Sequence, residues 1–311
     1  MSSMMVCVSH SPIIMVRAKA PDDEPAILRL YEQCSRDIAR FDPQLTVIFG
    51  SDHFAGFFLD TMPAYCLGLS AEAVADVGGF GGNLNVPGDT AKSLLVYLRE
   101  AGFDPAVSYK MTVDHAFSQP LHRLTGSLDA YPTIPVFIGA LAPPYMKFSR
   151  SRDFGAAVGR FLSSTGLRTL IIGSGGLSHH PTRYYPLVGE ASPEVAAWQM
   201  HGEQAGTFTA KQWHSKLHDD HIEGADMLIS GLRTAKDIRL NADFDRWYMT
   251  HLGKGDIDVL ANIPPDDAFE RAGIGSLELH TWIAALAAQQ AAGGALPTEQ
   301  IYSPTLEYGI G

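Results

Sequence analysis

The sequence predicts an α/β fold: a single domain, residues 1–311, with a central and largely parallel sheet flanked by helices. Apolar runs rich in β-branched residues recur along the chain and alternate with segments of helical period, as in proteins built from strand–helix–strand units. The runs are continuously apolar, which is typical of strands covered on both faces. Ligands of such sheets collect at the carboxyl ends of the strands, so a functional site is expected at that edge.

The expected strands are four apolar runs, at 4–10 (MMVCVSH), 44–53, 133–141 and 168–179. Helical patterns are found at 24–40, at 87–101 with Pro87 at its start, and at 151–165. From about 190 to 270 the chain is mainly helical and polar, and a last helix at about 276–292 is apolar enough to be buried. No internal repeat, low-complexity linker or charge block divides the sequence, which favours one domain.

Composition and charge exclude several classes of protein. The chain has a formal net charge of −11, so a nucleic-acid role has no electrostatic basis. No apolar run is long enough for a membrane span, and the acidic balance disfavours anionic membranes. The three cysteines cannot all pair and none lies in a CxxC motif, which predicts a reducing cytoplasm.

Histidine is the unusual feature of the composition, with 12 in the chain. His10 and His53 end two expected strands, and His179 ends the run at 168–179. His115 lies in the segment TVDHAFSQPL, and Glu278 lies on the apolar last helix, where a carboxylate needs a partner. These five residues are the candidates for metal binding and proton transfer.

Two imidazoles and one carboxylate with open coordination positions form the facial triad of non-haem Fe(II) oxygenases. Two neutral nitrogens and one anionic oxygen keep iron divalent, and the free positions admit a chelating substrate together with dioxygen. The same residues also suit zinc. Spacing does not decide between the metals, since the sequence holds no HExxH pair and the ligands would come from distant segments.

Ordinary structural roles compete with these assignments. A histidine at a strand end often just bonds a neighbouring loop. Asp52 would cap a turn or orient the ring of His53. His180 would be a loop residue, and Glu278 would pair instead with His280 or an arginine. The histidines expected on the surface are His122, His201, His214, His218, His221 and His251.

Two glycine-rich segments carry no familiar motif. The segment VGGFGGNL at 77–84 matches no phosphate-binding pattern and is interpreted as a loop. Ser174, in GSGGLSH, lacks the GxSxG frame of a hydrolase nucleophile. The glycines beside it would let the backbone turn tightly and approach a ligand.

Six blocks of the chain together resemble the class III extradiol dioxygenases. They are VSHSP, DHFAGFFLDTMPAYCLGL, VDHAFSQPL, IPVFIGALAPP, GSGGLSHHP and ELHTWIAAL. The resemblance runs from residue 5 to about 309 and is weakest between 185 and 265. It implies a single α/β domain, homo-oligomeric assembly, and extradiol cleavage of a catechol by dioxygen, next to the diol, in the catabolism of aromatic compounds.

The resemblance also assigns roles to particular residues. His10 and His53 match the two histidine ligands of a ferrous ion, and Glu278 matches its carboxylate ligand. His115 and His179 match the acid–base pair, with Asp114 as a supporting carboxylate beside His115. The implied substrate is a 3-substituted catechol with a short carboxylated chain.

Two other functions, and one residue for binding the substrate, are also compatible with the sequence. A zinc hydrolase with a metal-bound water would use the same residues. A non-enzymatic binding protein, of the mediator-of-cell-motility type, would share the fold without needing all five polar candidates. Arg183 is a candidate partner for a substrate carboxylate, although an exposed loop arginine is the more ordinary interpretation.

Overall fold

The central sheet has six strands in the order β1-β9-β2-β8-β3-β6. The computed structural model describes residues 2–16, 19–181 and 187–311. The strands of this sheet are β1 (Ser3–Val8), β2 (Leu45–Gly50), β3 (Tyr65–Gly68), β6 (Ala106–Ser108), β8 (Thr133–Ile138) and β9 (Thr169–Ser174). Neighbouring strands are parallel, except that β3 runs antiparallel to β8. The four strands expected from apolar runs are confirmed, and they are the four parallel neighbours β1, β9, β2 and β8.

Helices cover both faces of this sheet, which is why its strands are apolar throughout. On one face lie α3 (Gly88–Glu100), α5 (Phe148–Thr165) and α11 (Leu279–Ala291), and on the other lie α2 (Glu24–Phe41) and α4 (His115–Thr125). α5 and α11 pack closely because two glycines of α5 face the backbone of α11. A Cβ at Gly155 would lie 2.2 Å from the carbonyl oxygen of Ala284, and one at Gly159 would lie 2.1 Å from that of Ala288.

The structure also contains a second sheet of three strands, which was not predicted from the sequence. Its strands, in the order β5-β4-β7, are β4 (Ala71–Ala73), β5 (Gly82–Asn83) and β7 (Met111–Val113). Strands of two or three residues are too short to give a period in the sequence. β7 ends just before α4, so this sheet fixes the start of the helix that begins at His115.

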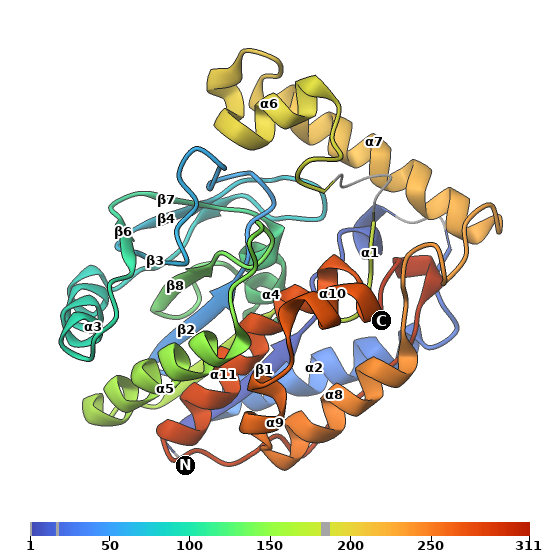
Figure 1. Cartoon of the computed structure of the whole chain (residues 1–311). Helices are drawn as coiled ribbons and strands as arrows, with labels where there is room; N and C mark the ends of the chain where they lie inside the picture. The colour runs from blue at the N-terminus through green and yellow to red at the C-terminus, as the bar shows by residue number, and fades with distance from the viewer. Residues whose placement is uncertain (1, 17–18, 182–186) are drawn as a thin grey trace.

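The region between 190 and 270 is helical, as expected. It contains α6 (Pro193–His201), α7 (Ala210–Ile229), α8 (Ala242–Lys254), α9 (Ile257–Ala261) and α10 (Pro265–Ala272). The short remaining helices are α1 (Ile13–Val16), η1 (Gly202–Ala205), η2 (Ile274–Glu278) and η3 (Leu306–Tyr308). α6 and α7 lie together at one end of the molecule, away from α5 and α11 (Figure 1). Among the described residues, no helix is both long and apolar enough to cross a membrane.

Candidate active site

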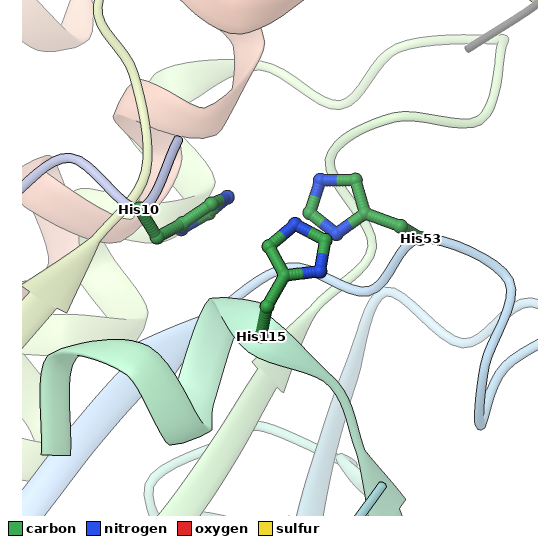
Figure 2. Close-up of side chains that lie close together, drawn as sticks. All are labelled: His10, His53 and His115. Atoms are coloured by element: carbon green, nitrogen blue, oxygen red, sulfur yellow. The ribbon is translucent and has the colours of Figure 1, made fainter. Parts of the chain in front are cut away.

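The carboxyl ends of parallel strands bring the two predicted histidine ligands together. β1, β9 and β2 are neighbours and parallel, so the loops that follow β1 and β2 leave the sheet at the same edge. His10 lies in the first of these loops and His53 in the second. Both rings are largely buried, with 4% and 14% of the side chain exposed. Their ring centroids are 5.3 Å apart (Figure 2).

The carboxylate of Glu278 lies against both of these rings. Its Oε1 is 3.1 Å from Nε2 of His10 and 3.4 Å from Nε2 of His53. Glu278 ends η2, the turn before α11, and α11 packs on β9. The acidic residue in an apolar segment therefore does have a partner, and the partner is the pair of histidines. His280, the alternative partner, bonds Ser151 instead, with Nδ1 2.8 Å from Oγ.

The glycine-rich turn after β9 holds this carboxylate in place. The N–H of Gly176 donates to Oε2 of Glu278 over 2.9 Å, and the hydroxyl of Ser51 donates to Oε1 over 2.7 Å. A Cβ at Gly175, whose φ is +135°, would lie 2.6 Å from Cβ of Glu278. The glycines of GSGGLSH thus allow a close backbone approach, as expected, and here the group approached is a protein carboxylate.

The hydrogen bonds behind each histidine determine which nitrogen faces Glu278. Ser174 donates its hydroxyl proton to the carbonyl of Ala116 over 2.5 Å, so it can only accept from Nδ1–H of His10, at 2.8 Å. Asp114 Oδ2 accepts from Nδ1–H of His53, at 2.9 Å. Both rings therefore turn Nε2 toward the carboxylate. Ser174 is a support for His10 rather than a nucleophile.

The charges of this cluster fit a divalent cation. Burial opposes ionisation of Glu278, but His10 and His53 hold its pKa well below the usual value. Burial likewise opposes the charged form of His53, but Asp114 and Glu278 raise its pKa well above the usual value. Two buried carboxylates thus retain a proton on an imidazole between them. A metal ion bound to the Nε2 atoms and Glu278 would supply positive charge at the same place.

His115 lies beside the two ligand candidates and is the first residue of α4. Its ring stacks on His53 with centroids 4.4 Å apart, and lies 5.3 Å from that of His10 (Figure 2). Donor atoms of all three histidines fall within 4.8 Å of one another, so distance alone would admit His115 as a ligand. Oε1 of Glu278, however, contacts Nε2 of His10 and of His53. His115 instead contacts the carboxylate of Asp76, whose Oδ2 is 2.5 Å from Nδ1 of His115. Burial lowers the pKa of His115 to about 4.

Asp114 supports a different histidine from the one expected. The expected partner was His115, its neighbour in the sequence. Instead, Oδ2 of Asp114 accepts from both the backbone N–H and the ring Nδ1–H of His53, over 2.7 Å and 2.9 Å. Oδ1 accepts from the N–H of Ala116 and caps α4. Because consecutive residues at a helix start point in different directions, adjacency in sequence did not indicate contact between the side chains.

His179 reaches the same place from the turn after β9. Its Nδ1 is 3.0 Å from the carbonyl oxygen of Leu177, which can only accept, so Nδ1 carries the proton. Gly275 makes room for the ring, since a Cβ there would lie 2.0 Å from Nδ1 of His179. Burial lowers the pKa of His179, which keeps the imidazole neutral.

One cavity joins these groups. It is lined by His10, His53, His115, His179 and Glu278, so the structure brings five of the six predicted site residues together. Asp114 lies behind His53 and does not line it. Apolar side chains form much of the remaining lining, among them Ile13, Val77, Leu141, Leu217 and Ile274. The arrangement can hold a metal ion with two imidazoles and a carboxylate, and can place two further imidazoles beside a ligand of that ion.

A family profile described as the catalytic LigB subunit of aromatic ring-opening dioxygenase matches residues 4–308. The chain belongs to this family. The similarity of its motifs to the class III extradiol dioxygenases is thereby confirmed, and this LigB-family protein is an extradiol ring-cleaving dioxygenase rather than a non-enzymatic relative of the fold.

Curated relatives of this LigB-family chain match it over nearly its full length. A protein of Paraburkholderia xenovorans is 37% identical over 308 residues, covering 99% of this chain and 95% of the relative. One from Photorhabdus laumondii is 38% identical, with the same coverage. A third, from Klebsiella pneumoniae, is 37% identical over 317 residues, covering 99% and 96%. All three are named 2,3-dihydroxyphenylpropionate/2,3-dihydroxicinnamic acid 1,2-dioxygenase.

Sequence reasoning wrongly placed one histidine of this LigB-family cavity on the surface. His221 is 6% exposed and lines the cavity, with Nδ1 2.6 Å from the carbonyl oxygen of Leu217. Burial lowers its pKa to about 3. A signal was present, because Leu217, His221, Gly224 and Leu228 recur at helical spacing and form the buried face of α7.

The other neighbouring residues have the ordinary roles considered for them. Asp52 caps a turn by accepting from the N–H groups of Ala55, Gly56 and Phe57. His180 is a loop residue, although a buried one at 5% exposure. Arg183, the candidate partner of a substrate carboxylate, lies outside the described residues.

Replacing Asp114 by Asn should weaken metal binding without breaking α4. An Asn oxygen still caps the helix, but the charge that orients His53 is lost. Loss of such a partner typically costs about 10–100-fold in metal affinity, which titration of the metal-free protein would measure. Asp52→Asn is the matched control, since Asp52 is a buried carboxylate next to His53 in the sequence that bonds backbone N–H groups only. Equal losses in both variants would contradict the role given to Asp114.

Proposed function

We propose that this protein is an Fe(II)-dependent extradiol dioxygenase acting on a 3-substituted catechol. The substrate is 3-(2,3-dihydroxyphenyl)propionate or 2,3-dihydroxycinnamate, as the names of the relatives suggest. The observation that carries the proposal is the position of Glu278 Oε1 between the Nε2 atoms of His10 and His53. These three residues are the proposed ligands. The ferrous ion would supply a template for catechol and dioxygen and a Lewis acid that eases loss of a catechol proton.

His179 is the proposed base. Its Nδ1–H is held by a neutral carbonyl, its ring is kept neutral by burial, and the ring lines the cavity. The lone pair of Nε2 can therefore accept a proton from a catechol hydroxyl. Proton transfer works best when the base is unprotonated at the working pH but its pKa is not far below that pH.

His115 is the proposed acid, and Asp114 supports the site through His53. His115 shares a proton with Asp76, whose pKa is raised well above its usual value by burial and by the nearby Asp114. The Asp76–His115 pair thus retains an additional proton at neutral pH, which the ring can deliver from Nε2 while Nδ1 is resupplied. That proton would go to oxygen during opening of the catechol ring.

The metal and the reaction class are tested together. Protein prepared without oxygen and reconstituted with Fe(II) should consume dioxygen only when a catechol is added, and should form a yellow ring-opened product from 3-substituted catechols. Zinc in place of iron should support no oxygen uptake. A zinc hydrolase on this fold would show the reverse: zinc in the purified protein and hydrolysis without dioxygen.

The position of ring cleavage is a separate prediction. We expect cleavage between the substituted carbon and its hydroxylated neighbour, and among catechols a preference for those with a short carboxylated chain. Mass spectrometry and NMR of the product distinguish this outcome from cleavage between the two hydroxylated carbons. A muconate product would contradict the proposal.

Three further properties complete the proposal. The protein is a single catalytic domain, which the family match over residues 4–308 supports. It works in the cytoplasm, where its free cysteines Cys7, Cys34 and Cys66 stay reduced. It forms a homo-oligomer, as its class does. Light scattering of the purified protein tests the last of these.

A further inference from the structure

A buried carboxylate that no motif indicated lies directly behind His115. Asp76 lies between β4 and β5, its side chain is 3% exposed, and its Oδ2 is 2.5 Å from Nδ1 of His115. We propose that Asp76 is the positioning residue of the proton donor: it holds the His115 ring with Nδ1 toward the carboxylate, so that Nε2 is the nitrogen offered to the cavity. This inference rests on the proposed function, which makes His115 the acid.

The loop that carries Asp76 is attached to the helix that carries His115. The N–H of Phe80 donates to Oγ of Ser118 over 3.0 Å, and Nε2 of Gln119 donates to the carbonyl of Gly78 over 3.2 Å. Ser118 and Gln119 lie one turn after His115 on α4. The acid and its carboxylate are therefore parts of one rigid unit, and the loop cannot shift without breaking bonds to the helix.

A stacking contact and a glycine complete this attachment. The ring of Phe80 stacks on that of His122, a further turn along α4, with centroids 3.7 Å apart. A Cβ at Gly79 would lie 2.1 Å from Oδ1 of Asp76, so any larger residue at this position would displace the carboxylate. The segment VGGFGGNL, which matches no phosphate-binding motif, thus has a reason for its glycines.

The energetics of Asp76 favour a functional role over a stabilising one. Its Oδ1 is buried without a hydrogen-bond partner among the described residues. A buried carboxylate with one unsatisfied oxygen destabilises a fold, because the desolvation of that oxygen is not compensated. In the part of the chain that the structure describes, the Asp76 side chain makes one hydrogen bond, and its partner is His115. Such a costly arrangement is typical of groups retained for the chemistry of a site.

A double-mutant cycle tests whether Asp76 acts through His115. The variants are Asp76→Asn, His115→Gln and their combination, each as the full chain reconstituted with Fe(II). Asp76→Asn should retain metal and the KM for catechol, while kcat falls of the order of 10²-fold, within the usual range for acid–base catalysis. In the His115→Gln background the same change should have almost no further effect, because groups that act as a unit are not additive.

A spectroscopic measurement separates positioning from a merely structural role. In metal-free full-length protein labelled with ¹⁵N-histidine, the Nδ1 signal of His115 is assigned by its loss in His115→Gln. Asp76→Asn should shift that signal. Asp256→Asn is the matched control, because Asp256 is the carboxylate 2.8 Å from Nδ1 of His251, a histidine that does not line the cavity. It should leave both kcat and the His115 signal unchanged.

Gly79→Ala is the second variant if Asp76→Asn folds poorly. It displaces the carboxylate without removing it, and should lower kcat in the wild-type background but not in His115→Gln. The inference is overturned if the losses of kcat from Asp76→Asn and His115→Gln multiply in the double variant. It is also overturned if Asp76→Asn loses metal, because Asp76 would then be a ligand. If His115→Gln keeps full turnover, the role proposed for His115 is wrong, while the ¹⁵N shift still decides whether Asp76 orients its ring.

Discussion

Replacing His10 or His53 by Ala should remove metal and activity together. Each variant deletes one of two nitrogens and leaves Glu278 with a single imidazole at hydrogen-bonding distance. Loss of a residue that hydrogen-bonds a metal ligand already costs about 10–100-fold in metal affinity, so loss of the ligand itself should cost more. Metal analysis of anaerobically reconstituted protein, with oxygen uptake on a 3-substituted catechol, measures both effects.

The control for these variants is His251→Ala. This histidine also has a carboxylate partner, Asp256, at 2.8 Å, but it does not line the cavity. It should bind metal and turn over as the wild type does. Full metal occupancy in both His10→Ala and His53→Ala would rule out the proposed ligand set. Retention in only one of them would point to His115 as the replacement nitrogen, since its donor atoms lie within 4.8 Å of the other two histidines.

Part of this site follows from the sequence because the fold is regular there. Parallel strands put their carboxyl ends at one edge, so histidines that follow two such runs are expected at the same edge. His10 and His53 do so, with rings 5.3 Å apart. For Glu278 the sequence indicated only that an acid on an apolar helix needs a partner, and similarity to a known family named the partner. The structure shows contact with both histidines.

The parts that sequence reasoning missed depend on contacts between distant loops. Asp76 is separated from His115 by a strand, a helix and two further strands, and nothing in its own segment indicates a partner. Asp114, by contrast, was assigned to its sequence neighbour, although helix geometry turns the two side chains apart and gives Asp114 to His53. His221 was missed because the polar residues around it in α7 concealed the apolar spacing of the buried face.

Four of the five histidines that line the cavity differ chiefly in what their Nδ1 atoms contact. Those of His53 and His115 face carboxylates, that of His10 faces a hydroxyl, and that of His179 faces a carbonyl. An imidazole backed by a carboxylate is stabilised when it carries positive charge or binds a cation, and one backed by a carbonyl gains much less. The four rings are alike in the sequence, and these second contacts give them different chemistry.

Replacing His115 or His179 by Gln should leave the metal bound while turnover falls of the order of 10²–10⁴-fold, the usual contribution of general acid–base catalysis. Neither residue is a proposed ligand. Gln is smaller than His and polar, so it should be accommodated in the cavity without adding charge. Metal content and the initial rate of oxygen uptake are the first measurements. Loss of metal in either variant would contradict the proposed division between ligands and proton-transfer groups.

The two losses should also differ in kind, because the two rings have different partners. Without His179 nothing accepts the catechol proton, so the defect should ease as pH rises and the substrate ionises unaided. Without His115 the substrate should still bind and lose its proton, and the reaction should stall later, when a proton is needed for ring opening. Raising the pH should not rescue that variant. Single-turnover absorbance, recorded with and without dioxygen across a range of pH, follows catechol ionisation and product formation separately. If both variants stall at ionisation, His179 and His115 do not divide the proton transfers between them as base and acid.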